Sequence, residues 1–244
     1  MKECSKAIHR RLADAKFATR YFVGRGLDIG GKPDPLSLYL ELFPRAESVR
    51  TWDWEDGDAQ FLASEADGTY DFVHSSHCLE HLVDAREGLA NWFRVLKPGG
   101  HLIVMIPDED LYEQGVFPST FNRDHKHTFT MWKPKSWSHA SINVLELLQV
   151  LGPLADVLKV EQLHGTYRFG LPRVDQTMSP VAESAIEFVV RKRFPIEVER
   201  GGRLPGTTQP DQETRIHFNQ YKADKDTIMR ANPDTPPLTN EDPL

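Results

Sequence analysis

The residues best suited to chemistry follow short apolar runs and combine aspartate with glycine. Asp28 is followed by Gly30 and Gly31 after one such run, and Asp53 closes the next run about 25 residues later. Glycines let the backbone approach a bulky ligand, and a carboxylate at a strand end accepts hydrogen bonds from the two hydroxyls of a ribose. A plain tight turn is the alternative for the glycines, and a solvated acidic loop is the alternative for Asp53. The spacing favours a site for a nucleoside cofactor.

Asp58 and Ala59, five residues further on, can offer a carboxylate and a backbone N–H to the edge of an adenine. Two competing motifs fail here. A dinucleotide-binding G-x-G-x-x-G does not fit these glycines in any frame. A calcium loop starting at Asp53 would need glycine where Asp58 stands and glutamate where Ser64 stands.

A segment rich in serine and histidine follows the third apolar run, with Ser75, Ser76 and His77 at its start. His77, Glu80 and His81 match the H-x-x-E-H of inverted zinc proteases, which needs both histidines on one helical face and a further ligand. This segment lies where a strand gives way to a helix, so hydrogen bonding at a helix start is the alternative for Glu80 and His81. We assign no metal to the site and keep metal-dependent hydrolysis as an alternative function.

A second histidine cluster, His125 and His127 around Lys126, lies in the loop after the next strand. Loops in this region overhang the sheet edge where ligands bind. In an extended loop the two histidines share one side, so either both face the cleft or neither does. Histidines bonded to neighbouring carbonyls are the alternative. With an ordinary pKa near about 6.5, histidine suits proton removal at neutral pH. The candidate bases, in order, are His125, His127, His77 and His81, with Asp108 as orienter or alternative base.

Apolar runs alternate with amphipathic segments along most of the chain, which is typical of a parallel sheet covered by helices on both faces. We therefore predict an α/β fold with an open, mostly parallel, doubly wound sheet. The expected strands are 26–31, which ends in glycines, 48–53, 70–75, 101–106, 157–162 and 185–191. The expected helices are 7–22, 36–42, 85–96 and 143–151.

Composition narrows the class of protein further. The 244 residues are 39% hydrophobic, enough for a globular core, and the net charge of −7 argues against a general nucleic-acid binder. No apolar run approaches the roughly 20 residues of a membrane span, and the first residues lack the apolar centre of a secretory signal. Cys4 and Cys78 are too few for a disulfide framework. We expect a cytoplasmic protein.

The chain divides by composition into 1–193, the expected catalytic domain, and 194–244, a polar extension. Seven of the 17 prolines lie in the extension, which has few large aliphatic residues. A lid, a strap in a homo-oligomer and disorder are the roles left open for it. Its scattered apolar anchors for packing on the domain are Ile216, Phe218, Tyr221, Ile228 and Met229.

Taken in order, these motifs resemble those of class I S-adenosylmethionine (SAM)-dependent methyltransferases. The likeness rests on the Asp-x-Gly-Gly turn, the strand-end acid, Gly57-Asp58-Ala59, and the segments Tyr70–Leu82 and Arg94–Asp108. It is greatest to small-molecule and glycan methyltransferases, whose fourth strand ends in a similar H-x-x-E-H. The resemblance implies a Rossmann-like sheet with an antiparallel last strand, and SAM as the cofactor.

The resemblance also implies roles for individual residues. Asp53 would hold the ribose hydroxyls. The residues that would line the rest of the cofactor are Asp28, Gly30 and Gly31 on the methionine and ribose side, Asp58 and Ala59 at the adenine, and Ser75, Ser76 and His77 near the reacting methyl. The sequence departs from the family at Lys32, where a further glycine is usual, and between Asp53 and Tyr70, where the third strand is shortened or absent.

The function expected from this resemblance is O-methylation of a small polar metabolite or of a sugar in a glycan precursor. Methyl transfer itself demands no metal. Two alternatives from other classes are a nicotinamide oxidoreductase and a catalytically silent, methyltransferase-like subunit that binds a partner.

Overall fold

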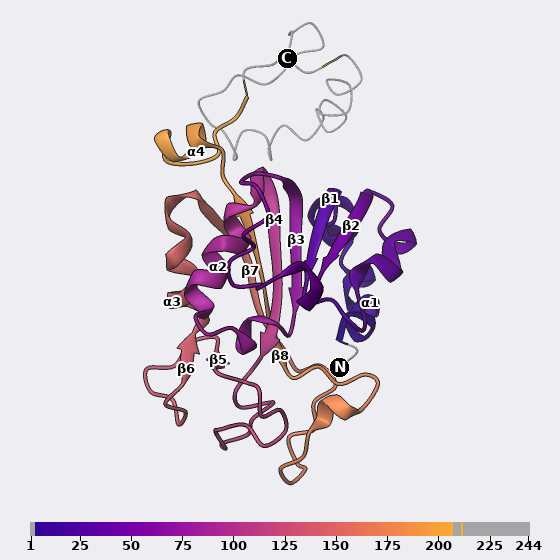
Figure 1. Ribbon diagram of the computed structural model, residues 1–244, viewed down its shortest axis with the longest axis vertical. Helices are drawn as coiled ribbons and strands as arrows, with labels where there is room; N and C mark the ends of the chain where they lie inside the picture. The colour runs from indigo at the N-terminus through magenta and orange to yellow at the C-terminus, as the bar shows by residue number, and fades with distance from the viewer. Residues whose placement is uncertain (1–2, 207–210, 212–244) are drawn as a thin grey trace, which may run out of the picture. The chain divides into compact units, whose positions relative to one another are not determined.

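The computed structural model describes residues 3–206 and 211. Its main sheet has six strands in the order β2-β1-β3-β4-β8-β7 (Figure 1). The strands are β1 (Gly24–Ile29), β2 (Ala46–Trp52), β3 (Tyr70–Ser76), β4 (Leu96–Pro107), β7 (Ala155–Leu163) and β8 (Ala185–Lys192). The first four run parallel, and β8 is antiparallel to both of its neighbours. The predicted fold class and the antiparallel last strand are confirmed.

Helices and a small second sheet surround the main sheet. The α-helices are α1 (Glu3–Ala13), α2 (Ala85–Arg94), α3 (Val144–Leu147) and α4 (Pro195–Glu199), and β5 (Thr128–Thr130) pairs with β6 (Ser141–Asn143). The shorter helical turns are η1 (Phe17–Tyr21), η2 (Leu36–Leu42), η3 (Trp54–Asp56), η4 (Leu79–His81), η5 (Leu148–Leu154) and η6 (Gln176–Met178).

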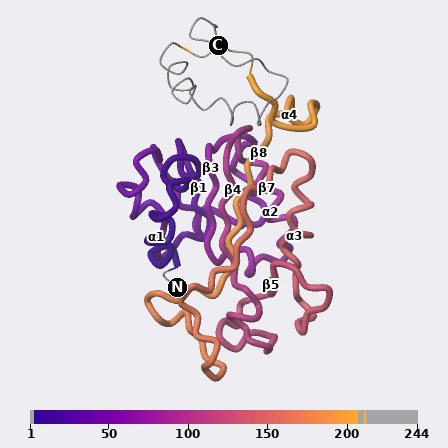
Figure 2. The backbone as a smooth tube through the Cα atoms, turned by 180° about the vertical axis from the view of Figure 1, so that it is seen from behind, coloured from indigo at the N-terminus to yellow at the C-terminus, as the bar shows by residue number. Residues whose placement is uncertain are grey.

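Alternation along the strands divides the core into two layers. Phe72 and Ile103 face the layer that holds α1, where they pack with Ile8, and Val73 and Leu102 face the layer that holds α2. Figures 1 and 2 show α2 and α1 on opposite faces of the sheet. The carboxyl ends of β1, β2 and β3 lie at one edge of the sheet, where ligands bind in open α/β folds.

Two predicted helices are wrong in extent. The segment 7–22 breaks after Ala13 and resumes as the π-helical turn η1, because Phe17 and Phe22 both enter the core while Leu12 remains 44% exposed. The segment 143–151 begins as strand β6, forms one turn of α-helix and continues as η5, which is kinked at Gly152, where φ is +65°. Core contacts overrode the local helical spacing in both places.

Two other predictions are confirmed. The helix expected from residue 85 begins there as α2, and Asp84 caps it by accepting the N–H groups of Arg86 and Glu87 at 2.8 and 3.1 Å. The structure describes every residue between β2 and β3, and none of them forms a strand. The short segment between Asp53 and Tyr70 predicted that the family's third strand would be shortened or absent.

The chain falls into two compact units, 1–201 and 202–244. In the first unit α4 follows β8, and Arg191 of β8 pairs with Glu197 of α4 at 2.9 Å. The proposed boundary after residue 193 remains a proposal, and the apolar anchors expected between 216 and 229 lie outside the described residues. Among the residues that the structure describes, no helix combines the length and apolarity that crossing a membrane requires.

Candidate active site

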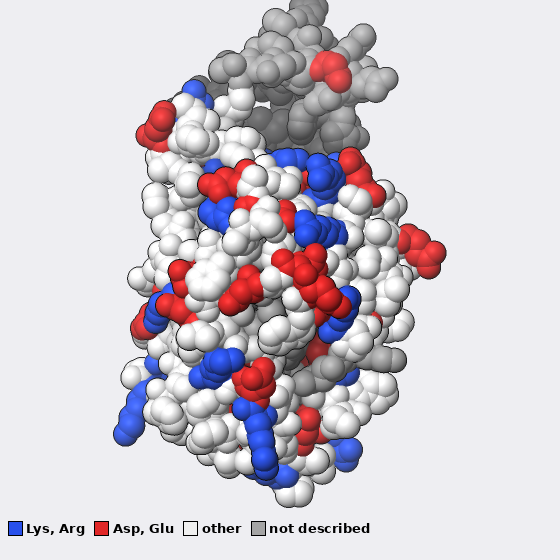
Figure 3. Space-filling view, viewed as in Figure 1, with Lys and Arg blue, Asp and Glu red and all other residues white. Residues whose placement is uncertain are grey.

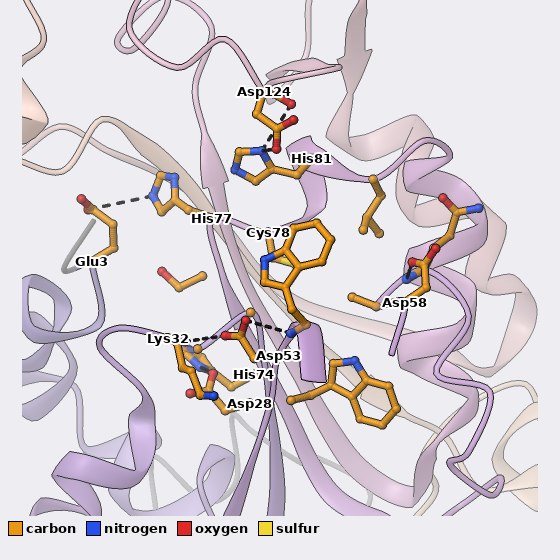
Figure 4. Close-up of a pocket in the computed structure, with 18 of the residues that line it drawn as sticks. Glu3, Asp28, Lys32, Asp53, Asp58, His74, His77, Cys78, His81 and Asp124 are labelled. Atoms are coloured by element: carbon orange, nitrogen blue, oxygen red, sulfur yellow. Dashed lines mark hydrogen bonds and ion pairs between the residues drawn. The ribbon is translucent and has the colours of Figure 1, made fainter. Parts of the chain in front are cut away.

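A cavity of about 620 Å³ opens at the carboxyl ends of β1, β2 and β3, a size typical of sites for small ligands (Figure 4). Residues from the turn after each strand line it, together with the start of α1 and the loop after β4. The predicted site residues among its lining are Asp28, Gly30, Gly31, Asp53, Asp58, Ala59, Ser76 and His77. The sheet therefore gathers most of the predicted cofactor residues at one edge.

The turn after β1 presents bare backbone to the cavity. Gly30 has a φ of +69°, and a Cβ there would lie 2.8 Å from the Cβ of Cys78. A Cβ on Gly31 would lie 2.4 Å from an oxygen of Asp28. Both positions thus require glycine, which is how a backbone comes close to a bulky ligand. Lys32, where the family usually has a further glycine, also lines the cavity, and its ammonium pairs with Glu55 at 2.8 Å.

Asp28 lies at the cavity wall but is already engaged in the fold. One oxygen accepts the N–H of Leu36 at 2.7 Å, and the other lies 2.6 Å from Nδ1 of His74. Burial lowers the pKa of His74, despite the opposing pull of Asp28. Asp28 therefore ties the end of β1 to η2 and β3 and shapes the turn that the glycines form.

Hydrogen bonds hold Asp53 in place without using all the acceptor lone pairs of its carboxylate. Its two oxygens accept the N–H groups of Lys32 and Trp54 at 3.1 and 2.9 Å, and its own N–H bonds to Asp56 (Figure 4). Each carboxylate oxygen has a second lone pair, so Asp53 can still accept hydrogen bonds from a ligand. Asp58 is exposed at the mouth of the cavity, where one of its oxygens accepts the N–H of Gln60 at 2.8 Å.

Trp54 is the feature of this turn that sequence reasoning missed. Its side chain is 91% exposed and lines the cavity mouth. An indole left in water beside a cavity offers a flat apolar surface for a base. The sequence feature that could have identified Trp54 is its position directly after the strand-end acid Asp53.

At the end of β3, Ser75 and Ser76 lie in different surroundings. Ser75 is fully buried, donates its hydroxyl to the carbonyl of Ile29 at 3.0 Å and is absent from the cavity lining. Ser76 lines the cavity, and within the described part of the chain its hydroxyl has no hydrogen-bond partner. His77 follows with a φ of +54°, a left-handed conformation that is costly for a residue with a Cβ and turns the chain sharply at the cavity.

His77 lies between two carboxylates. Its Nε2 is 4.0 Å from Glu3 of α1 (Figure 4), and its Nδ1 is 3.4 Å from Glu80 of η4. Burial alone would lower the pKa of His77, but Glu80 and Glu3 outweigh it and the pKa is raised. Glu3 was missed by sequence reasoning, because nothing local in an N-terminal helix indicates that it reaches the ends of β3 and η4.

The loop after β4 meets the cavity through residues other than its histidines. Asn122, Asp124 and Lys126 line the cavity, whereas His125 and His127, both described, do not. Nε2 of His127 lies 3.3 Å from the carbonyl of Val83. The loop thus realises the second of the two arrangements expected for alternating residues, in which neither histidine faces the cleft.

Asp108 lies away from the cavity lining as well. One oxygen accepts the N–H groups of Asp110 and Leu111 at 3.0 and 3.2 Å, and the other accepts Gln162 at 2.9 Å. Burial raises the pKa of Asp108 despite these bonds. In this structure the residue organises the turn after β4.

A parallel sheet with a reversed strand β8, a glycine turn after β1 and an aspartate after β2 define a class I SAM-dependent methyltransferase fold. A family model described as a methyltransferase domain matches residues 2–148. The chain belongs to that family of enzymes, and its cofactor is S-adenosylmethionine. This assignment takes the place of the nicotinamide oxidoreductase and metal-dependent hydrolase alternatives.

Solved structures and one curated sequence are similar to the chain. A Bacillus halodurans C-125 protein assigned as a methyltransferase has a TM-score of 0.50 and 14% identity, covering 77% of this chain and 99% of its own. Phosphoethanolamine N-methyltransferase 2 of Haemonchus contortus, solved with SAM, has a TM-score of 0.46 and 15% identity, covering 76% and 53%. An uncharacterized 37.1 kDa protein in a Streptomyces fradiae transposon is 38% identical over 66 residues, which are 27% of this chain and 19% of that protein. The match thus spans about a fifth of that relative.

Proposed function

We propose that this protein transfers a methyl group from SAM to an oxygen atom of a small polar metabolite or a sugar, including sugars of glycan precursors. The observation that carries this proposal is the polarity of one end of the cavity. Beyond the cofactor turns, the cavity is lined by Glu3, His77, His81, Asn122, Asp124 and Lys126. Such a surface of donors and acceptors suits an acceptor with several hydroxyl groups.

The cofactor fits the other end of the cavity. The bare backbone at Gly30 and Gly31 would lie against its methionine and ribose side, Asp53 would accept the ribose hydroxyls, and Asp58 with Ala59 would meet the adenine. Trp54 would cover the base. Ser76 and His77 would border the methionine part. When bound, SAM supplies an electrophilic methyl group on a positively charged sulfur.

Charge around the mouth supports binding of a cation. Asp53, Glu55, Asp56 and Asp58 lie within six residues, and Figure 3 shows acidic side chains gathered near the middle of this face. A field of one sign at a cleft raises the local concentration of an oppositely charged ligand. Because Lys32 and Arg50 pair with Glu55 and Asp56, the charges of Asp53 and Asp58 are the ones that would favour the sulfonium group.

His77 is our choice as the proton acceptor, since it lines the cavity while His125 and His127 do not. In the transfer the carbon–sulfur bond breaks, with its electron pair remaining on sulfur, and a carbon–oxygen bond forms. The proton of the acceptor hydroxyl passes to the imidazole of His77, and Glu3 and Glu80 stabilise the resulting charge.

Replacing His77 with asparagine is expected to lower kcat by about 100-fold or more, because a general base contributes a rate enhancement of at least this size. The affinity for SAM, measured by calorimetry, should change little. The assay uses SAM labelled in its methyl group with panels of polyols, free sugars, nucleotide sugars and primary amines, and locates the label in the product by NMR.

Labelled methyl ethers from hydroxylated acceptors would support the proposal. Methylation confined to the amines would contradict it. Tight SAM binding without transfer to any acceptor in the panels would favour a catalytically silent subunit instead.

Replacing Trp54 with alanine is expected to weaken SAM binding about 5- to 150-fold, since stacking of a base on an aromatic ring contributes about 1–3 kcal/mol. Calorimetric titration measures the effect. Leu38, another large apolar side chain that is 64% exposed but does not line the cavity, is the matched control, and Leu38→Ala should bind SAM normally. An unchanged affinity of the Trp54 variant would place the adenine elsewhere.

A further inference from the structure

We propose that Glu80, His81 and His125 bind one divalent transition-metal ion at the polar end of the cavity. One carboxylate oxygen and two imidazole nitrogens from these residues lie within 4.8 Å of one another. Glu80 and His81 belong to η4, and His125 comes from the loop after β4. Their approach is built into the backbone, because the carbonyl of Glu80 accepts the N–H groups of Lys126 and His127 at 2.8 and 3.3 Å.

Each histidine is oriented by a carboxylate on its far side. Nδ1 of His81 lies 3.0 Å from Asp124, and Nδ1 of His125 lies 2.7 Å from Glu113 (Figure 4 shows the first pair). With these carboxylates as acceptors, each Nδ1 carries the proton and each Nε2 has a free lone pair. Both Nε2 atoms lie 3.9 Å from the same oxygen of Glu80. Carboxylate–histidine pairs directed at one point are the usual arrangement around a bound metal.

The atoms that face one another here lack partners. Glu80 is fully buried, and within residues 3–206 neither of its oxygens accepts a hydrogen bond. Nε2 of His125, whose side chain is only 1% exposed, is also without a partner in that range. A buried carboxylate without full compensation costs several kcal/mol, and Nδ1 of His77, 3.4 Å from Glu80, is too far away for a charge-assisted hydrogen bond. A proton shared with Glu80 would draw an Nε2 to about 2.8 Å from its oxygen, well inside the 3.9 Å observed. A cation between the three groups satisfies all of them.

The donor set indicates which cation. Imidazole nitrogen with a single carboxylate suits zinc, and related first-row ions such as manganese, whereas magnesium and calcium prefer oxygen ligands. Metal–ligand distances of about 2.0–2.2 Å require the three groups to close slightly around the ion. His81, whose side chain is 26% exposed, has the room to move.

The site would keep an open position toward the cavity, because His81 is a cavity-lining residue while Glu80 and His125 lie behind it. Resting on the proposed function, this places an acceptor oxygen on the metal, where a Lewis acid lowers the pKa of a hydroxyl and orients it. The metal site itself stands on the geometry of the three ligands.

The test is calorimetric titration of the full chain, freed of metal with a chelator, using zinc, manganese and magnesium chlorides. We expect one zinc ion per chain and little magnesium binding. Glu80→Gln and His125→Ala should each weaken zinc binding by more than about 100-fold, and Glu113→Gln by about 10- to 100-fold as an orienting partner. His127→Ala is the matched control, from the same loop but outside the cluster, and should bind zinc with unchanged affinity.

A second measurement separates a metal site from a structural role of Glu80. Without metal, Glu80→Gln should melt no lower than the unmodified protein, since the charge it removes is fully buried and is offset only by His77 at 3.4 Å. Zinc should raise the melting temperature of the unmodified protein and not that of the variant. Failure of the unmodified protein to bind zinc or manganese would overturn the inference, as would equal affinity in the Glu80 and His125 variants.

Activity measurements distinguish this inference from the proposed function. Zinc binding lost on Glu80→Gln, in a protein that transfers no methyl group to oxygen, would support the metal site and contradict the proposed function. Methyl transfer to oxygen by a protein that binds neither zinc nor manganese would do the reverse.

Discussion

Replacing Asp53 with alanine is expected to weaken SAM binding by about two to four orders of magnitude. Asp53 ends β2 at the cavity, and its two oxygens have lone pairs left after accepting Lys32 and Trp54. Hydrogen bonds to a charged group contribute about 1.5–3 kcal/mol each, and a ribose offers two hydroxyls. Isothermal titration with SAM measures the loss.

Two further variants make this result specific. Asp53→Asn preserves the size of the side chain but removes the charge, so it should lose an intermediate part of the affinity. Glu55→Ala removes a neighbouring carboxylate that is 70% exposed and pairs with Lys32, and it should bind SAM almost normally. Equal affinities in the Asp53 variants and the unmodified protein would remove Asp53 from the cofactor site.

Replacing Glu187 with leucine is expected to lower the free energy of unfolding by about 3–5 kcal/mol. Glu187 of β8 is fully buried and pairs with Arg10, Arg11 and Lys159 at 2.8, 3.1 and 3.0 Å. Arg11 is also fully buried, so the substitution leaves a charge without its partner in the core. Urea denaturation measures the change.

Glu183→Leu is the control for Glu187, because it removes another carboxylate of Arg10 whose side chain keeps 13% exposure. We expect about 1 kcal/mol or less from it, since a partly solvated pair contributes little. Similar losses in the two variants would show that burial of Glu187 is not the source of its effect.

The same group predicts a pH dependence of stability. Burial raises the pKa of Glu187, but Arg11, Arg10 and Lys159 outweigh it and lower the pKa from 4.5 to about 2. Because the folded value lies below the unfolded one, its contribution is complete above about pH 4.5 and is lost as the pH falls toward 2. The difference amounts to about 3 kcal/mol. Stability measured across that window should fall less steeply in the Glu187→Leu variant than in the unmodified protein.

Anchoring of α1 links stability to the site. Arg10 and Arg11 hold this helix on β8, and the same helix delivers Glu3 to the cavity, 4.0 Å from His77. The Glu187 variant should therefore lose transfer activity before it unfolds. In a denaturant titration, its KM for the acceptor should rise at concentrations below the unfolding transition.

The sequence by itself determined the fold class, the six strands of the main sheet and the glycine and aspartate turns, because these depend on short-range patterns. A short apolar run bounded by turn residues indicates a buried strand, and glycine after such a run indicates a turn. Where long-range packing competed, as at Phe17 and Phe22, the local helical spacing was insufficient.

Only the tertiary structure decided which polar side chains meet. The residue type alone made His125 a candidate base. Its direction away from the cavity depends on Glu113, which holds its ring, and on Glu80, whose backbone carbonyl anchors the loop. Glu80 and His125 are 45 positions apart, and Arg11 and Glu187 are 176 apart. Contacts at such separations depend on the paths of the intervening loops and on the packing of whole layers, and no local period of the sequence records either.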